Sequence, residues 1–341
     1  MNVLSVTSEF APLVKTGGLA DVAGALPAAM AGQGVHMRTL LPGYPAVMAA
    51  LKGGREVMAD WDLFGAAARV VAGKAEGQDL LVLDAPHLFE RDGSPYLDAS
   101  GHDWPDNPTR FAALGWMAAR VAMEGVDGWL PNVVHCHDWQ AGLAPVYLAE
   151  RMETGRPGIL LTIHNIAFQG LAPATQIGPL RLPPYRFNPE GFEYYGQVSA
   201  LKAGLVFADK INTVSPTYAR EIMTADFGMG LEGVLRSRAT DVSGILNGID
   251  TKAWNPGTDP AIPSKFKSPK TKAKNKAALR DELGLPDADG PLAVVVSRLT
   301  RQKGLDVLLA ALPDFLSGGG QLALLGSGEA DLEVGYRDLA T

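Results

Sequence analysis

Short apolar segments alternate with segments of helical periodicity along most of this 341-residue sequence. Many of the short segments are apolar on both faces, which is typical of strands covered by helices on both sides. The repeated order of strand and then helix predicts an α/β protein with mainly parallel sheets. The expected strands are residues 2–7, 37–41, 80–84, 133–137, 158–164, 210–214, 242–246, 291–297 and 321–325. The expected helices are residues 19–31, 109–123, 139–151, 216–223, 274–283, 303–316 and 329–340.

The length of the chain exceeds what one compact domain usually holds, so we expect two domains, residues 1–240 and 241–341. The strand expected at 242–246 would open the second domain. Residues 254–276 are rich in proline and lysine and lack apolar periodicity, which predicts a solvated loop, although the lysines could instead contact an anionic partner. Residues 43–107 have the least regular pattern of the first half and are expected to decorate the scaffold.

Composition narrows the class of protein. A hydrophobic fraction of 47% is enough for a sizeable core. The net charge of −7, without an extended basic face, argues against nucleic acid as the main partner. No apolar run approaches the roughly 20 residues needed to cross a bilayer, and the first residues have the pattern of a buried strand, so we expect a cytoplasmic protein with no membrane partner. Cys136 is the only cysteine, which excludes disulfide scaffolds and all-cysteine metal sites.

A glycine pair follows the first expected strand and precedes the first expected helix. Gly17 and Gly18 would let the backbone turn sharply and approach a ligand closely. The helix N-terminus beyond them suits phosphate, and Lys15 adds a mobile ammonium group. The dinucleotide fingerprint and the Walker loop are both absent, so nicotinamide binding is disfavoured. Taken alone, the pair could also be a simple tight turn.

A similar order of strand, cationic loop, glycine and helix occurs in the second half. Arg298 and Lys303 follow the strand expected at 291–297 and are spaced to flank one anion. Two α/β units that each present cations and a helix start to a common crevice would hold a nucleotide diphosphate between them. Alternatively, the second loop is a solvated cationic cap of the helix without a ligand.

Polar side chains end two further strands. His135, His137 and Asp138 come at the end of one, and His164 and Asn165 at the end of the next. Zinc binding would require a third ligand at a recognisable spacing, and none occurs. Because parallel strands place their carboxyl ends at the ligand-binding edge of a sheet, we favour sugar-hydroxyl recognition there. For each histidine alone, a purely structural role remains open.

Five motifs occur in order along the chain and together resemble the bacterial glycogen synthases and the plant starch synthases. They are Lys15-Thr-Gly-Gly-Leu-Ala-Asp-Val, His135-Cys-His-Asp-Trp-Gln-Ala-Gly-Leu, Thr162-Ile-His-Asn-Ile-Ala-Phe-Gln-Gly, Leu246-Asn-Gly-Ile-Asp and Val296-Ser-Arg-Leu-Thr-Arg-Gln-Lys-Gly. The resemblance covers the whole chain. It implies a GT-B fold, in which two Rossmann-like, doubly wound parallel-sheet domains face a cleft, with the second domain incomplete here.

The resemblance also implies the reaction and the site. The expected enzyme is a retaining glucosyltransferase that moves glucose from ADP-glucose to the 4-hydroxyl at the non-reducing end of an α-1,4-glucan, with no metal and no cofactor. The implied catalytic set is His164, Arg298, Lys303 and Asp138, and the implied ADP-glucose-binding set is Lys15, Gly17, Gly18, Asp21, Asn247 and Tyr96. Of these, Asp21 and Asp138 are expected to orient the site, and Tyr96 to line the cleft.

The sequence ends before motifs that the family carries later, namely a Glu-Pro-Cys-Gly-Leu-like segment and a second Thr-Gly-Gly-Leu turn. We therefore expect an incomplete second domain and weak or no activity from the chain as it stands. Two other functions stay open at this point. One is a nucleotide-sugar transferase with a different donor or acceptor, and the other is a non-catalytic glucan-binding or regulatory protein.

Overall fold

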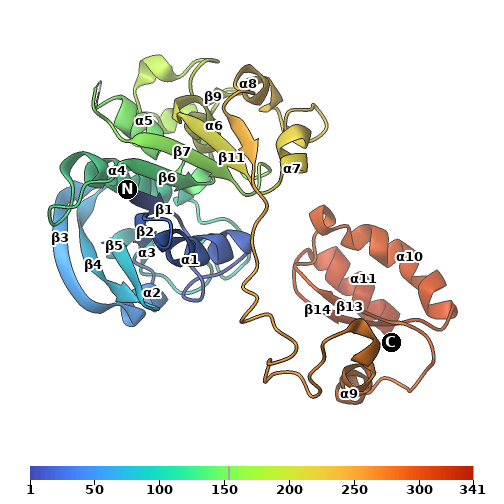
Figure 1. The fold of residues 1–341 in the computed structure, drawn as a ribbon. Helices are drawn as coiled ribbons and strands as arrows, with labels where there is room; N and C mark the ends of the chain where they lie inside the picture. The colour runs from blue at the N-terminus through green and yellow to red at the C-terminus, as the bar shows by residue number, and fades with distance from the viewer. Residues whose placement is uncertain (153, 341) are drawn as a thin grey trace. The chain divides into compact units, whose positions relative to one another are not determined.

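A computed structural model describes residues 1–152 and 154–340 of the chain. The chain divides into two compact units, Met1–Gly248 and Ile249–Thr341, which are considered separately below (Figure 1). Residues between the end of β12 (Val242–Gly244) and η4 (Pro269–Thr271) include no helix or strand.

The first unit is built on a nine-stranded sheet in the order β12-β11-β7-β6-β1-β2-β5-β4-β3. The pairs from β12 to β5 are parallel, as the strand–helix alternation predicts. The central strands β1, β6 and β7 are almost wholly buried toward their carboxyl ends, which explains their continuous apolar sequences. These parallel strands are β1 (Asn2–Val6), β2 (His36–Pro42), β5 (Gln78–Asp84), β6 (Val133–His137), β7 (Gly158–Ile163), β11 (Lys210–Thr213) and β12.

Residues 43–75, for which no strand was expected, contain two strands. β3 (Lys52–Leu63) and β4 (Ala66–Ala75) form an antiparallel hairpin, and β4 pairs antiparallel with β5. Register shifts interrupt the β3–β4 ladder, and β3 is largely exposed. Charged residues and glycines in an exposed edge strand weaken the alternation on which strand prediction depends.

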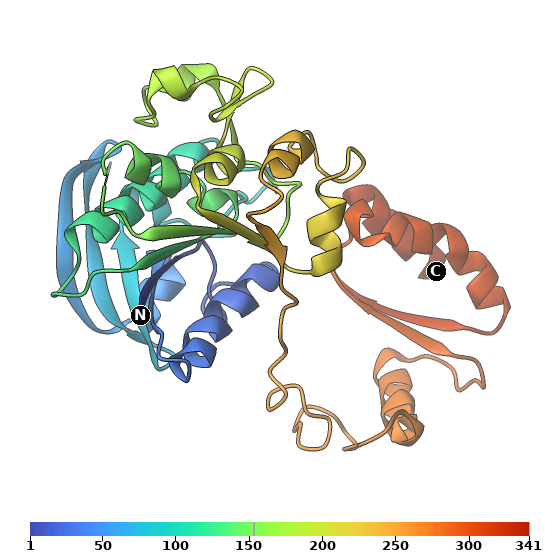
Figure 2. The ribbon, with the colours of Figure 1, turned by 45° about the horizontal axis from the view of Figure 1, so that its top comes forward.

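Helices cover both faces of this sheet (Figure 2). α1 (Gly18–Ala31) packs against β2 on one face, and α4 (Asn107–Glu124) packs against β1 and β2 on the other, beside α5 (Ala144–Ala149). The remaining helices are α2 (Pro45–Ala50), α3 (Pro86–Phe89), α6 (Ala200–Phe207), α7 (Pro216–Glu221) and α8 (Glu232–Ser237), with 3₁₀ turns η1 (Trp139–Ala141), η2 (Ala174–Gln176) and η3 (Pro184–Arg186). A small antiparallel sheet adds β8 (Leu171–Pro173), β9 (Glu193–Tyr194) and β10 (Gln197–Ser199).

The single helix expected at 139–151 is instead split into η1 and α5. Gly142 lies at the break, and a Cβ on it would come within 2.2 Å of the carbonyl oxygen of Ala200, at the start of α6. Pro145 then occupies the first turn of α5, where its missing N–H costs nothing. Close backbone approach therefore interrupts a segment whose composition alone favours one helix.

The segment expected to open the second domain belongs to the first. β12 pairs parallel with β11, with Ile211 beside Val242 and Thr213 beside Gly244. The division between the units accordingly falls after Gly248 rather than after residue 240. A three-residue strand is too short for its own pattern to say which sheet it joins.

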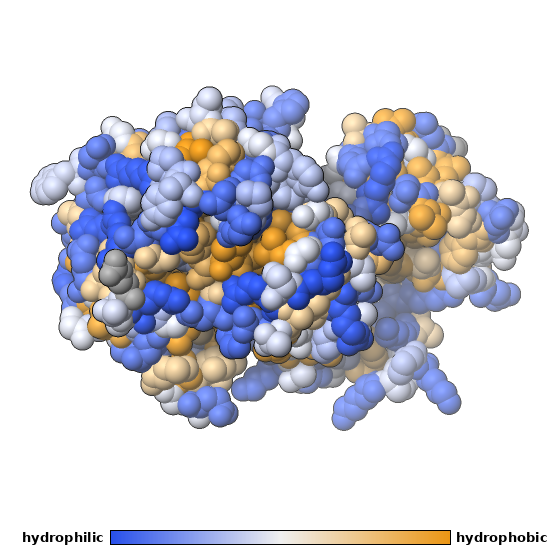
Figure 3. Space-filling view, turned by 90° about the horizontal axis from the view of Figure 1, so that it is seen from above, coloured by the Kyte–Doolittle hydropathy of each residue, from blue (hydrophilic) through white to orange (hydrophobic). Residues whose placement is uncertain are grey.

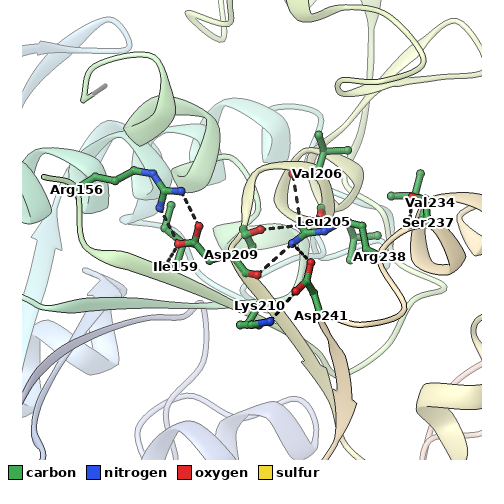
Figure 4. Close-up of polar contacts among 11 residues, drawn as sticks. Arg156, Ile159, Leu205, Val206, Asp209, Lys210, Val234, Ser237, Arg238 and Asp241 are labelled. Carbon is green, nitrogen blue, oxygen red and sulfur yellow. Dashed lines mark hydrogen bonds and ion pairs between the residues drawn. The ribbon is translucent and has the colours of Figure 1, made fainter. Parts of the chain in front are cut away.

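An ion-pair network holds the amino ends of β7, β11 and β12 together (Figure 4). The Asp209 carboxylate accepts hydrogen bonds from both terminal nitrogens of Arg156, at 2.6 and 2.7 Å. Arg238 donates to the carbonyl oxygens of Leu205 and Ala208, each at 2.6 Å, and to Asp241 at 3.0 Å. Arg238 thus caps the C-terminus of α6 and ties it to the edge strand.

The second unit has a two-stranded parallel sheet, β13 (Leu292–Val296) and β14 (Gln321–Leu325). α10 (Leu305–Ser317) and α11 (Ala330–Ala340) cover one face of the sheet (Figure 2), with Leu305, Leu332 and Tyr336 in the core between them. The unit also contains α9 (Ala273–Leu283), η4 and η5 (Arg301–Lys303).

Apolar side chains of β13 and β14 remain exposed away from that core. Val294, Val296 and Leu325 are 54%, 73% and 71% exposed. Hydrophobic side chains also appear among hydrophilic ones on the faces of both units seen in Figure 3. None of the helices in residues 1–152 and 154–340 has both the length and the apolar character needed to span a bilayer.

Candidate functional site in the first unit

Most of the candidate residues of the first unit lie at the carboxyl ends of its central strands. β1 leads through residues 7–17 into α1, β6 ends at His137, and β7 ends just before His164. Side chains after neighbouring parallel strands meet at one edge of a sheet, and this edge is where open α/β sheets bind ligands. We call residues 15–18 the glycine loop.

Lys15 extends from the glycine loop and pairs with the first turn of α1. Its Nζ donates to Oδ1 of Asp21 at 2.7 Å, and about half of each side chain remains exposed. An exposed ion pair of this kind is weak, because water and salt screen it. Lys15 is therefore held near the start of α1 and can still redirect its ammonium group to an arriving anion.

Gly17 and Gly18 leave open space rather than relieving a strained turn. Gly17 has φ −160° and ψ −165°, an extended conformation that any residue can adopt. A Cβ built on either glycine meets no atom within 4 Å. The sequence suggested that a sharp turn requires glycine here. The structure shows no such turn at Gly17 and instead shows open space beside the backbone at the start of the helix.

A carboxylate that the sequence analysis left without a role supports the glycine loop. Glu9 Oε2 accepts hydrogen bonds from the backbone N–H groups of Thr16 and Gly17, at 2.5 and 3.2 Å. Glu9 Oε1 accepts from Thr16 Oγ1 at 2.6 Å and from the Tyr96 hydroxyl at 2.7 Å. The structure thus places the Tyr96 hydroxyl against Glu9 and Ser8, so that Tyr96 supports the loop from within the unit.

The only sequence signal for Glu9 was its place, two residues after the end of the first expected strand. A charged residue after a strand ordinarily predicts solvent exposure. Its burial here depends on Tyr96, which is far away in the sequence, and so no local pattern could reveal it.

A cavity of about 460 Å³ borders the glycine loop. Lys15 and Thr16 line it on one side, and Arg91 and Arg110 on another. Arg110 is buried and donates to the carbonyl oxygens of Leu88 and Pro95, both at 2.8 Å, while Arg91 pairs with Asp106. Asp92 lines the cavity as well, and Arg110 is the arginine there whose positive charge is not balanced by an ion pair within the described residues.

Three histidines form a stack at the ends of β6 and β7. The ring centroids of His135 and His137 are 4.1 Å apart, and those of His137 and His164 are 5.3 Å apart. His137 Nδ1 hydrogen-bonds with His164 Nε2 at 3.0 Å, and its Nε2 with Ser5 Oγ at 3.2 Å. His135 Nε2 hydrogen-bonds with Thr162 Oγ1 at 2.6 Å. His164 is therefore oriented by a chain of partners that reaches back to β1.

Burial keeps these imidazoles neutral. It lowers the pKa of His164 to about 4 and that of His135 to about 3, and it holds the pKa of His137 well below its ordinary value. Neutral histidine can donate at one ring nitrogen and accept at the other, as recognition of sugar hydroxyls requires. Among residues 1–152 and 154–340, no group of three or more His, Cys, Asp or Glu side chains is arranged to hold a metal ion.

Asp138 positions the turn that carries His164. It is 7% exposed, and its Oδ1 accepts the backbone N–H of His164 at 2.6 Å and that of Asn165 at 3.3 Å. Its backbone, with φ +52° and ψ −165°, lies outside the left-handed helical region, in a conformation that residues other than glycine rarely adopt. Burial raises the pKa of the Asp138 carboxyl to about 7, despite the two backbone hydrogen bonds that act in the opposite direction.

The other predicted site residues lie outside this edge. Arg298 and Lys303 belong to the second unit, on either side of Arg301, and both side chains are exposed. Arg301 forms ion pairs with Glu329 and Asp331. The side chains of Arg298 and Lys303, in contrast, have no ion-pair partner in the described part of the chain. Asn247 is exposed in the segment after β12, next to the division between the units.

Comparison with known proteins shows the family to which the chain belongs. Residues 2–237 match the family of starch synthase catalytic domains. The chain is 60% identical over 340 residues to the glycogen synthase of Paracoccus denitrificans, covering 99% of this chain and 70% of that protein. It is 57% identical over 339 residues to the glycogen synthase of Roseobacter denitrificans, covering 98% of this chain and 71% of that protein.

Solved structures agree with this placement. The catalytic domain of starch synthase IV from Arabidopsis thaliana, bound to ADP and acarbose, superimposes with a TM-score of 0.84 at 30% identity, covering 99% of this chain and 71% of that one. Sucrose-phosphate synthase from Thermosynechococcus elongatus, at 18% identity and a TM-score of 0.50, shares the fold alone. The chain therefore belongs to the glycogen and starch synthase family, and it is a glycosyltransferase of the α/β GT-B fold class.

Proposed function

We propose that this protein transfers glucose from ADP-glucose to the 4-hydroxyl at the non-reducing end of an α-1,4-glucan, with retention of configuration and without a metal ion. The observation that carries the proposal is the glycine loop. It combines a redirectable lysine, open space at two glycines and the start of a helix at the ligand-binding edge of the sheet.

The diphosphate of the donor would bind at this loop. Lys15 supplies a positive charge, and the unpaired N–H groups in the first turn of α1 supply donors at the positive end of the helix dipole. Gly17 and Gly18 leave the space that a phosphate oxygen would need to reach the backbone. Arg110, which lines the neighbouring cavity, adds to the attraction for an anionic donor.

The chemistry follows from where charge develops. Breaking the anomeric bond gives an oxocarbenium-like sugar and a diphosphate whose negative charge grows. Arg298 and Lys303, whose side chains have no ion-pair partner in the described residues, are suited to stabilise that leaving group, an effect that can be worth several kcal/mol. The leaving phosphate can itself accept the proton of the attacking hydroxyl, so that no separate general base is needed.

The remaining residues orient the sugar. His164, neutral and fixed by His137, would hydrogen-bond the transferred glucose. Asp138 holds the backbone of His164 in place, and Asp21 holds Lys15. Asn247 would contact the donor or its leaving group.

Donor choice is tested by titrating the chain with ADP-glucose and with UDP-glucose in a calorimeter, and by measuring incorporation of labelled glucose into glycogen from each. We expect tighter binding and faster incorporation with ADP-glucose. Preference for UDP-glucose would refute the donor assignment. Glucan binding that persists without any ADP-glucose binding would instead favour a non-catalytic glucan-binding protein.

The phosphate role of the loop is tested by Lys15→Ala. Loss of one charge-assisted contact should weaken ADP-glucose binding by about 1.5–3 kcal/mol, which is roughly tenfold to more than a hundredfold. Lys210→Ala is the matched control, because Lys210 makes a similar exposed ion pair, with Asp241 at 2.6 Å, at the amino end of β11. Equal affinities for the two variants would refute the role of Lys15.

A further inference from the structure

Glu9 occupies two of the backbone donors that a loop of this kind would be expected to offer to phosphate. The N–H groups of Thr16 and Gly17, which directly precede α1, both point at Glu9 Oε2. While Glu9 stays in place, the N–H groups of Thr16 and Gly17 are not free for an arriving diphosphate, which can use the N–H groups from Gly18 onward and the ammonium of Lys15. The internal carboxylate must therefore either position the loop for the donor or leave when the donor binds.

The contacts around Glu9 favour a fixed carboxylate. Glu9 is 3% exposed, and four donors converge on its two oxygens. Displacing it would strand a buried charged group without partners, and such a group is costly to leave unsatisfied. A permanent carboxylate with four donors costs far less.

The backbone on both sides of Glu9 is also anchored. Thr7 Oγ1 donates to the carbonyl oxygen of Glu9 at 2.9 Å. Phe10 and Val14 exchange two backbone hydrogen bonds of 2.9 Å, and the N–H of Ala11 donates to the carbonyl oxygen of Ala20 in α1 at 3.0 Å. The segment that carries Glu9 is thus tied to the helix whose N-terminus it faces.

We propose that Glu9 is a positioning residue for the nucleotide-sugar donor. It holds the Thr16–Gly17 backbone so that Lys15, the open space at the two glycines and the N-terminus of α1 face the diphosphate together. This inference rests on the proposed function of the glycine loop. Tyr96 helps to fix Glu9, because its hydroxyl donates to Glu9 and hydrogen-bonds with Ser8 Oγ at 2.7 Å.

The test uses ADP as the probe and the whole chain as the protein. ADP affinity is measured by calorimetry, and the protection of the Thr16 and Gly17 amides by hydrogen exchange, for Glu9→Ala and Glu9→Gln. The matched control is Glu193→Ala, which removes a carboxylate that accepts the N–H of Gly196 at 2.6 Å in the turn between β9 and β10.

We expect Glu9→Ala to lose amide protection at the loop and to bind ADP at least tenfold more weakly, with the control unchanged in both. Glu9→Gln keeps an acceptor oxygen and the shape of the side chain, so it should restore a large part of both properties. If Glu9→Ala does not fold, Thr16→Val, which removes one donor to Glu9 without a change of volume, should give a smaller loss of ADP affinity.

The outcomes separate the two proposals. If Lys15→Ala weakens ADP binding while Glu9→Ala or Thr16→Val leaves it unchanged or tighter, the positioning role is wrong and Glu9 is a competitor of the donor. If Lys15→Ala has no effect on ADP affinity, the phosphate role of the loop fails first, whatever the hydrogen exchange of the Glu9 variants shows.

Discussion

The carboxyl group of Asp138 offers a quantitative test of the site's electrostatics. Asp138→Asn keeps the size of the side chain and an oxygen that can accept the His164 N–H. The substitution removes the ionisable carboxyl group at this position. The difference in free energy of unfolding between the variant and the natural protein therefore isolates the proton equilibrium of Asp138 from that of every other group.

Burial sets the sign and the size of the effect. The pKa of Asp138 is raised from 3.8 to about 7 in the folded protein. The folded state thus holds the proton more tightly than the unfolded state, so stability falls as pH rises from about 4 to about 7 and is level above that. This difference between the folded and unfolded pKa corresponds to about 4 kcal/mol of stability, of which about 2 kcal/mol is lost between about pH 5.5 and about pH 8.

Urea unfolding of both proteins at about pH 5.5 and about pH 8 measures this change. We expect the stability of Asp138→Asn relative to the natural protein to rise by about 2 kcal/mol over that interval. Asp209→Asn is the control, because hydrogen bonding to Arg156 lowers the pKa of Asp209 and its titration lies below this range. A relative stability of Asp138→Asn that does not change with pH would refute the reasoning.

Three further outcomes follow from the structure. In a protein extended to the length of its relatives, Arg298→Ala should lower kcat for glucosyl transfer more than it raises KM, because the charge that Arg298 meets grows in the transition state. The opposite pattern in steady-state kinetics would make Arg298 a ground-state binder. Arg238→Ala should destabilise the first unit by about 2–3 kcal/mol in urea unfolding, since carbonyl groups at the end of α6 lose their donor; a loss below about 0.5 kcal/mol would contradict its capping role. Gly142→Ala should lower the stability of the protein by more than about 2 kcal/mol, because the new Cβ meets the Ala200 carbonyl. Gly233→Ala, in open space on α8, should raise the stability by about 0.5–1 kcal/mol, and equal effects of the two variants in thermal unfolding would refute the packing argument.

Strands made of continuous apolar runs were predictable from sequence. The expected strands at 133–137 and 321–325 coincide with β6 and β14, because apolar runs bounded by polar turns leave few alternatives. The β3–β4 hairpin was missed, since an exposed strand such as Lys52–Leu63 lacks that signal. The membership of β12 in the first sheet was also missed, because pairing with β11 is a tertiary choice.

The candidate site shows the same division. Motifs identified Lys15, Asp138 and His164, and the structure adds how the last two are joined, by the hydrogen bond from the His164 N–H to the Asp138 carboxylate. Glu9 and the His137 bridge to His164 depend on contacts between distant parts of the chain, and no spacing in the sequence encodes them.

The free space beside Gly17 and Gly18 separates two kinds of selection on this protein. Because a Cβ at either position meets no atom of the described chain within 4 Å, the packing of the folded chain does not require glycine there. A randomised library sorted first for folded protein should keep many residue types at both sites. A second sort for nucleotide binding should return almost only glycine. Glycine at these two positions would then be required by the ligand and not by folding.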